Sequence, residues 1–199
     1  STLDRSSAAS DVYKRQEHFE VIRCWTLSGP ASASPHGDGA SCGARIQEGD
    51  VLVNIVIPRL NGLTIENERT WFCGTPSAEQ VRLWSAAKAA NEAAIAAART
   101  GNPVCAIDAA AQAEIEKAGY ADFIRHRTGH AVGIIHHEYP EDMAFNQRPL
   151  LDNEVYSAEP GIYAYGIGGF RLDDTVVVGS TPRVLTHTPK TLELSLIHI

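Results

Sequence analysis

The chain has 199 residues, a formal net charge of −7 and a hydrophobic content of 44%. That length suits one domain, and that apolar content is sufficient to build a core. The negative charge disfavours nucleic acid and anionic membranes as partners, and no apolar run is long enough to cross a bilayer. The cysteines are widely spaced, which is typical of thiols in a reducing compartment. With no signal peptide at its start, the sequence predicts a cytoplasmic protein.

The two ends of the chain differ in character from the rest. Residues 1–16 are polar and without period, and their second half resembles translated sequencing adapter at the edges of metagenomic reading frames. Residues 195–199 resemble the same kind of adapter sequence. Segments of this kind are excluded from fold reasoning. We therefore expect 1–16 and 191–199 to be non-native tails, and 17–190 to form part of a catalytic domain.

The first half of the chain is patterned as strands. Residues 50–57 are β-branched and apolar, as in a buried strand, and Pro58 ends the run because proline cannot donate to the ladder. Asn61 and Gly62 are the strongest short signal for a β-hairpin, which predicts a returning strand over 63–72. Ahead of this hairpin the pattern predicts a strand over 19–25 and a turn-rich loop over 28–39.

The second half begins with helices. Ser77 and Gln80 have the spacing of a capping box, and the residues that follow are rich in strong helix formers, which predicts a helix over 78–99. A second helix is predicted over 107–118, with Gly119 as its cap. Short strands are then expected over 130–136, 154–159 and 170–178. Strands on both sides of a helical pair predict an α+β domain.

A dense set of polar residues follows the second predicted helix. Residues 125–138 contain His126, His130, His136, His137 and Glu138 around two glycines. Two further dense segments, 157–163 and 168–175, carry Glu159 and Asp173. Histidine serves in proteins as a metal ligand and a proton shuttle. A histidine followed by two separated acids has the ligand chemistry of a divalent metal site.

These segments resemble the family of methionine aminopeptidase, aminopeptidase P, prolidase and creatinase. Four further motifs match that family in its order, so that the resemblance covers about residues 18–188; they are 49–53, 61–62, 68–70 and 75–80. The resemblance implies the pita-bread fold, an α+β architecture, with its N-terminal portion missing from this chain. It also implies hydrolysis of a C–N bond, and a homodimer in the full-length parent.

In that family, five side chains bind two metal ions. The matched positions in this chain hold one amide, one imidazole and three carboxylates, namely Asn54, Glu66, His130, Glu159 and Asp173. Only His130 and Glu159 are of the type that the family has there. Asn54 is neutral, and Glu66 and Asp173 differ by one methylene from the expected acids. These departures favour one ion, Mn²⁺ or Zn²⁺, or none, over two.

The resemblance leaves two mechanisms open. In the metallopeptidase form, the ion activates water, His36 and His137 stabilise the oxyanion, and the substrate is an Xaa-Pro peptide. In the creatinase or ectoine hydrolase form, no metal is bound and His36 moves the protons. Glu68 and Glu159 then hold the cationic head of a guanidine or amidine. A third possibility is a pita-bread domain that binds peptide or protein without catalysis.

Several neighbours of these positions have expected supporting roles. Arg69 and Arg171 are predicted to orient site carboxylates as charge partners. Asp174 is predicted to lie outside the site, because neighbours on a strand face opposite ways. Tyr163 is predicted to pack rather than react. Carboxylates crowded together repel one another, so a cation, either an ion or a substrate group, is expected among them.

Overall fold

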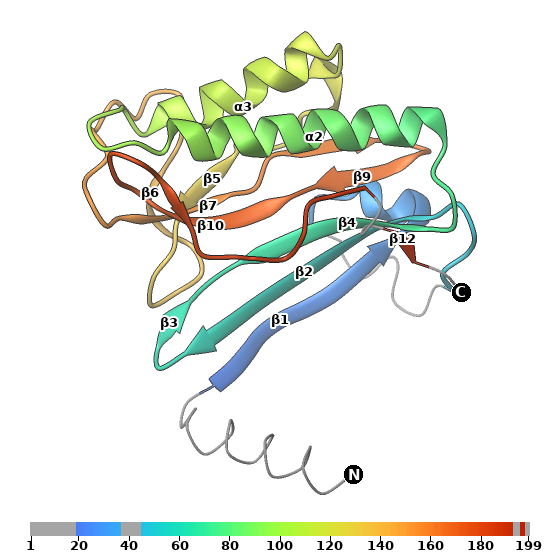
Figure 1. Ribbon diagram of the computed structural model, residues 1–199, viewed down its shortest axis with the longest axis horizontal. Helices are drawn as coiled ribbons and strands as arrows, with labels where there is room; N and C mark the ends of the chain where they lie inside the picture. The colour runs from blue at the N-terminus through green and yellow to red at the C-terminus, as the bar shows by residue number, and fades with distance from the viewer. Residues whose placement is uncertain (1–18, 37–44, 193–195, 198–199) are drawn as a thin grey trace, which may run out of the picture.

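The computed structural model describes residues 19–36, 45–192 and 196–197. The expected tail 1–16 lies outside the described residues, and of the tail 191–199 only a few residues are described. Two long helices form one layer and a curled β-sheet forms the other (Figure 1). The predicted α+β class is therefore confirmed.

The main sheet has the strand order β1-β2-β4-β10-β7-β5-β6, so that strands far apart in the sequence become neighbours at β4 and β10. A small second sheet pairs β8 with β9. The strands are β1 (Phe19–Ser28), β2 (Val51–Leu60), β3 (Leu63–Thr64), β4 (Asn67–Cys73), β5 (Gly129–Ala131), β6 (Glu138–Glu141), β7 (Val155–Ala158), β8 (Gly161–Ala164), β9 (Gly168–Arg171), β10 (Asp173–Val177), β11 (Arg183–Val184) and β12 (Leu196–Ile197). The last of these, inside the expected tail, pairs in parallel with β4.

The predicted hairpin is confirmed between β2 and β3. Asn61 and Gly62 have φ angles of 50° and 87°. Two consecutive positive φ angles are those of a type I′ turn, whose twist matches that of the strands it joins. Leu60 pairs with Leu63 across the turn. The turn fixes the register of β2 against β4, and this register decides which side chains of the two strands share a face.

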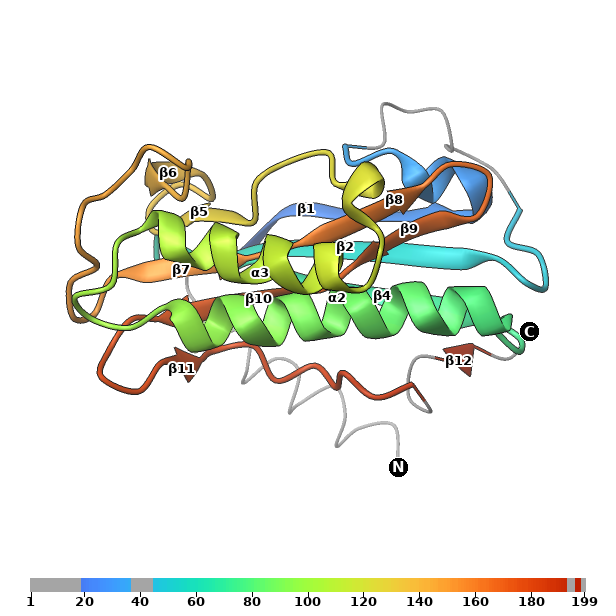
Figure 2. The same ribbon diagram turned by 90° about the horizontal axis from the view of Figure 1, so that it is seen from above.

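The helices are α2 (Ala78–Ala97) and α3 (Cys105–Lys117), with short 3-10 turns η1 (Gly29–Ala33) and η2 (Ala121–Phe123). The predicted capping box is present, because Ser77 Oγ accepts from the Gln80 backbone N–H and the Gln80 side chain accepts from that of Ser77. Ala87, Ala90 and Ala94 are fully buried. Their small side chains let α2 lie close to the sheet and α3 (Figure 2).

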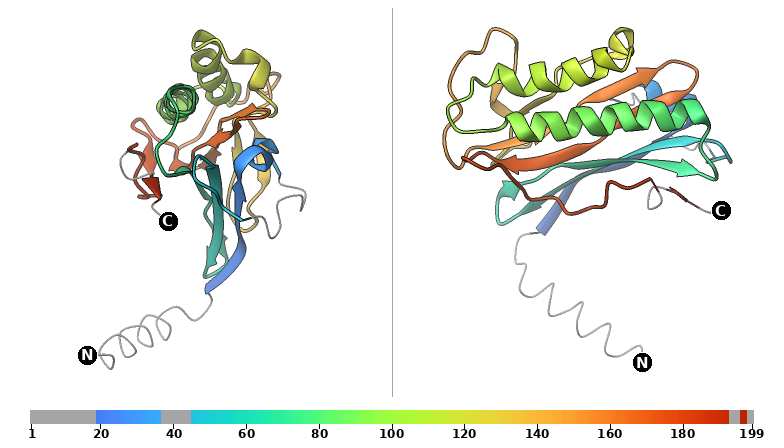
Figure 3. Two further views of the ribbon diagram at one scale, coloured as in Figure 1. Left: turned by 90° about the vertical axis from the view of Figure 1, so that its right-hand side faces the viewer. Right: turned by 45° about the horizontal axis from the view of Figure 1, so that its top comes forward.

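The layered arrangement leaves β1 and β2 extending beyond the helices, as the two views of Figure 3 show. The main core lies between the helices and the sheet, and it includes Phe72, Leu83, Tyr156 and Phe170. A smaller cluster of Val53, Ile55 and Ile57 lies elsewhere on β2. None of the described helices combines the length and apolar character needed to cross a membrane.

The strand expected over 63–72 is interrupted between β3 and β4, and two other predicted strands also differ from the structure. The strand expected over 130–136 ends at Ala131, because the next residues form a tight turn. In this turn the Gly133 N–H donates to the Ile135 carbonyl, and the Ile135 N–H donates to the Glu138 carboxylate. The strand expected over 170–178 is two strands, β9 and β10, which belong to different sheets. Alternation of residue type alone did not reveal these breaks.

Candidate active site

The register of three strands brings the acids of the site together. Ile55 on β2 lies opposite Glu68 on β4, and Glu68 lies opposite Asp173 on β10. Residues directly opposite one another in a sheet point to the same face. Trp25 on β1 extends this row at its other end, opposite Ile55. The row therefore runs from apolar side chains on β1 and β2 to acidic ones on β4 and β10.

His130 and Glu159 reach the same face from β5 and from the end of β7. His130 lies opposite Ser157, and the Glu159 N–H donates to the Thr128 carbonyl at 2.7 Å. A side chain at Gly129 would place its Cβ 2.0 Å from the Ser157 carbonyl oxygen, so only glycine allows β5 to pair this closely with β7. His130 Nε2 lies 3.2 Å from Glu159 Oε1 and 3.6 Å from Glu66 Oε2.

The orientation of the His130 ring is set by the backbone. Its Nδ1 lies 3.0 Å from the Ala131 carbonyl oxygen, which can only accept, so Nδ1 carries the proton. In a neutral ring the lone pair of Nε2 then points at Glu66 and Glu159. That arrangement is unfavourable between bare anions and favourable around a cation. The cluster therefore calls for a positive charge between Nε2 and the two acids.

The pKa values of the acids also indicate that a positive charge would be favourable among them. Burial, followed by the charges of Asp173, Glu159 and Glu68, raises the pKa of Glu66 to about 11. Burial also raises the pKa of Asp173 well above its usual range, and that of Glu68 to about 7 despite its Arg171 partner. For Glu159, burial acts in the same direction, but the neighbouring His130 ring and the charge of Arg171 lower its pKa to about 2.

Two buried carboxylate oxygens of this cluster have neither a hydrogen bond from a described residue nor an ion pair with an arginine. They are Oε2 of Glu66 and Oδ2 of Asp173, whose residues are 5% and 0% exposed. The other oxygen of Asp173 accepts from Ser157 Oγ at 2.8 Å. Buried acids without partners are costly, and this cost is removed when they coordinate a cation. The donors present therefore fit a divalent metal ion.

Two groups of side chains, which share Glu159, could each hold a metal ion, because the ligand atoms within each group lie within 4.8 Å of one another. One group is Glu66, Glu68 and Glu159, and the other is His130, His137 and Glu159. The rings of His130 and His137 are stacked, with centroids 3.6 Å apart. Burial and the neighbouring His130 lower the pKa of His137 to about 4, so this ring is neutral at pH 7.

Glu68 differs from the other acids because Arg171 holds it from two sides. Nε and Nη2 of Arg171 pair with the two carboxylate oxygens. Nη1 of Arg171 donates to the Pro35 carbonyl at 2.8 Å and to the Tyr163 hydroxyl at 3.0 Å. The Tyr163 hydroxyl in turn lies 2.6 Å from His126 Nε2. The prediction that Arg171 orients a site carboxylate agrees with these contacts, whereas Tyr163 has a polar role that the sequence did not indicate.

These side chains enclose a small pocket with a volume of about 60 Å³. The predicted residues His36, Glu66, Glu68, His130, His137 and Glu159 line it. His36 and His137 are exposed, so they lie at its mouth. Four lining residues were not predicted for the site from the sequence, namely Arg23, Trp25, Ile55 and Ile57, and His136 joins them from the turn after β5. Strand pairing brings the first four here, and no local motif marks them.

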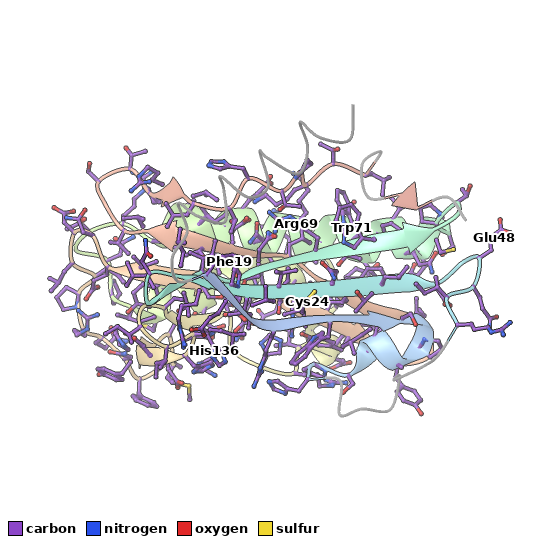
Figure 4. The ribbon with its side chains drawn as sticks, turned by 90° about the horizontal axis from the view of Figure 1, so that it is seen from below. Phe19, Cys24, Glu48, Arg69, Trp71 and His136 are labelled. Carbon is purple, nitrogen blue, oxygen red and sulfur yellow. The ribbon has the colours of Figure 1, made fainter. Side chains whose placement is uncertain are left out.

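The structure does not bring Asn54 into the site. Its Nδ2 donates to Thr26 Oγ1 at 2.9 Å and to the Trp25 carbonyl at 3.3 Å. It lines a different pocket, on the other face of the sheet, with Arg69 and Trp71. Figure 4 shows Arg69 and Trp71 on one side of the strands and His136 on the other. The prediction that Asn54 is a metal ligand is therefore wrong. Side chains on a strand alternate between its faces, and the neighbour Ile55 is the residue that faces the acids.

Comparisons with known proteins agree with this architecture. The model of metallopeptidase family M24 matches residues 5–180. This chain belongs to that family. It is 37% identical to the putative dipeptidase YkvY of Bacillus subtilis over 167 residues, which are 83% of this chain and 46% of that protein. The chain thus spans about half the length of the curated relatives it matches.

Solved structures give the same result. The crystal structure of dipeptidase PepE from Mycobacterium ulcerans matches 90% of this chain and 48% of its own, with a TM-score of 0.83 and 33% identity. The prolidase from Pyrococcus horikoshii OT3 matches 85% of this chain and 48% of its own, with a TM-score of 0.80 and 30% identity. The predicted pita-bread fold is confirmed. The family match begins at residue 5, inside the expected tail 1–16, so the boundary of that tail stays a prediction.

Proposed function

We propose that the whole protein hydrolyses the C–N bond of a short peptide, as a dipeptidase or Xaa-Pro dipeptidase. The observation that carries this proposal is the buried cluster of Glu66, Glu159 and Asp173 beside the Nε2 atom of His130. Two of its carboxylate oxygens lack partners within the described residues. A set of donors of this kind supports metal-assisted hydrolysis. The dipeptidase names of the relatives support a peptide as the substrate.

Each side chain of the site has a role in this proposal. Glu66, His130, Glu159 and Asp173 would hold a divalent ion, Mn²⁺ or Zn²⁺. Such an ion, when bound, lowers the pKa of water and polarises the carbonyl. His137 and His36 lie at the mouth of the pocket, where an imidazole N–H can donate to the oxyanion that forms.

Glu68 and Glu159 complete the proposed site as acceptors for the substrate. Both line the pocket, and Arg171 fixes the direction of the Glu68 carboxylate. An ammonium group at the amino end of a peptide would donate to these oxygens. We further propose, on the family resemblance, that the whole protein is a cytoplasmic homodimer.

A second candidate is metal-free hydrolysis of a small guanidine or amidine, with His36 as the general base. Ile55 favours it, because an apolar side chain stands on β2 in line with the acids. The pairing of Glu68 with Arg171 also favours it, since a paired carboxylate is a poor metal ligand. In this form the cation that the acids require is the substrate itself.

An activity screen separates the two candidates. The purified protein is assayed on dipeptides, Xaa-Pro dipeptides and small guanidines, with and without Mn²⁺. We expect peptide turnover that depends on metal, and His137→Ala should lower kcat/KM by about 100-fold or more. The matched control is His187→Ala, because His187 lines the pocket on the opposite face. Turnover of guanidines alone, without metal, would favour the second candidate, and a folded protein that turns over neither class contradicts both.

A further inference from the structure

The cross-strand row of the site changes chemistry between β2 and β4. Trp25 and Ile55 occupy its first two positions, and Glu68 and Asp173 occupy the next two. Every side chain in this row points to the same face. The acidic half of the site is therefore formed by β4, β10 and the end of β7. Strands β1 and β2 contribute only the apolar side chains of Trp25 and Ile55 to this row.

Strand β2 supplies no oxygen ligand to this face near the acids. Ile55 and Ile57 are its residues that line the pocket. The amide of Asn54, one position away, points to the other face and donates to the main chain and hydroxyl of β1. Divalent ions such as Mn²⁺ and Zn²⁺ are bound by oxygen, nitrogen or sulfur atoms, and isoleucine offers none of these.

Glu68 is already engaged by another partner. Arg171 contacts both of its carboxylate oxygens, and both side chains are buried. The guanidinium is itself anchored by the Pro35 carbonyl and the Tyr163 hydroxyl, so it is held in place. A two-point ion pair between a guanidinium and a carboxylate is strong and directional. The charge of Glu68 is therefore already balanced by Arg171, and Glu68 does not need a metal ion as its partner.

The donors left for a metal are Glu66, Glu159, Asp173 and His130. Oε2 of Glu66 and Oδ2 of Asp173 are buried and accept no hydrogen bond from any described residue. His130 Nε2 lies 3.2 Å from Glu159 Oε1 and 3.6 Å from Glu66 Oε2. Three carboxylates and one imidazole are sufficient to bind one Mn²⁺ or Zn²⁺ ion, with a further position for water if the ion has more than four ligands.

We infer that this chain binds a single divalent ion among Glu66, His130, Glu159 and Asp173, and that Ile55 excludes a second ion. This inference rests on the metal-dependent form of the proposed function. It differs from the two-ion site that the family resemblance implies. It also assigns to Ile55, a residue with no polar atom in its side chain, control over how many ions are bound.

The test is a count of metal ions in the purified protein. The protein is loaded with Mn²⁺, dialysed, and measured by elemental analysis and by electron paramagnetic resonance. We expect one ion per chain, with the spectrum of an isolated Mn²⁺ ion rather than that of a spin-coupled pair. Ile55→Asp should raise the content to two and produce the coupled signal. Asn54→Asp is the matched control, and it should leave the content at one because its carboxylate faces the other side.

Each outcome decides the inference. Two ions or none in the folded wild-type protein would overturn it, as would an Ile55→Asp variant that folds and still binds one. If Ile55→Asp does not fold, Ile55→Asn gives a smaller polar change at the same position, and the wild-type count stands as a test by itself. Circular dichroism checks the fold of each variant. One ion without peptide hydrolysis would leave this inference standing and contradict the proposed function, whereas hydrolysis with two ions would do the reverse.

Discussion

The two faces of β4 and β10 use the same kinds of residue in opposite ways. On one face, Glu68 and Asp173 belong to a crowded acidic cluster. On the other face, their sequence neighbours Arg69 and Asp174 form a buried ion pair at 2.7 Å. Thr186 and Lys190 complete the partners of Asp174, at 2.6 Å each. Asp174 thus has a full set of partners and stabilises the pairing of its strand, whereas Asp173 has an oxygen without a partner among the described residues, as a ligand of a cation would.

The opposite face should therefore dominate stability. We predict that Asp174→Ala lowers the free energy of unfolding by about 3–5 kcal/mol, because it leaves the Arg69 guanidinium buried without its carboxylate partner. Urea denaturation followed by circular dichroism measures this loss. Arg82→Ala is the control, since it removes an exposed ion pair with Glu79 and should cost less than about 1 kcal/mol. Equal losses of stability in the two variants would contradict the prediction that the buried ion pair of Arg69 and Asp174 stabilises the fold more than an exposed pair does.

The site face should respond in the opposite direction. We predict that Glu66→Gln raises the free energy of unfolding by roughly 1–3 kcal/mol in metal-free buffer at pH 7. Burial and the neighbouring acids raise the pKa of Glu66 to about 11, so folding must protonate this carboxyl, whereas Gln is neutral in both states. Thermal unfolding with a chelator measures the gain. Added Mn²⁺ should stabilise the wild-type protein more than this variant, since an ion stabilises the state that binds it. A variant less stable than wild type under chelation would show that the cluster needs no cation.

Much of the fold follows from local patterns in the sequence. The Asn61-Gly62 turn and the capping box of Ser77 and Gln80 are determined by nearby backbone geometry, and both are confirmed. The acids near His130 were identified through the resemblance. The Tyr163 contacts depend on residues 8 and 37 positions away in the chain, so no local pattern reveals them.

The error at Asn54 has a simple physical source. A strand alternates its side chains between two faces, so a match displaced by one residue moves a ligand from the site to the far side. Asn54 and Ile55 lie within residues 51–57, where every residue except Asn54 is apolar, so apolar side chains occupy both faces of the strand. Hydrophobic alternation therefore gave no signal for the face. Only the pairing of Ile55 with Glu68 decides it.

The smallest predicted effect tests this correction directly. We predict that Asn54→Ala lowers the free energy of unfolding by only about 1 kcal/mol, because it removes hydrogen bonds to Thr26 and to the Trp25 carbonyl in a half-buried place. The metal content and kcat/KM should stay at wild-type values. Elemental analysis and peptide hydrolysis measure both in one preparation. A loss of bound metal would mean that Asn54 reaches the ion. The assignment of Asn54 to the face opposite the acids would then be wrong.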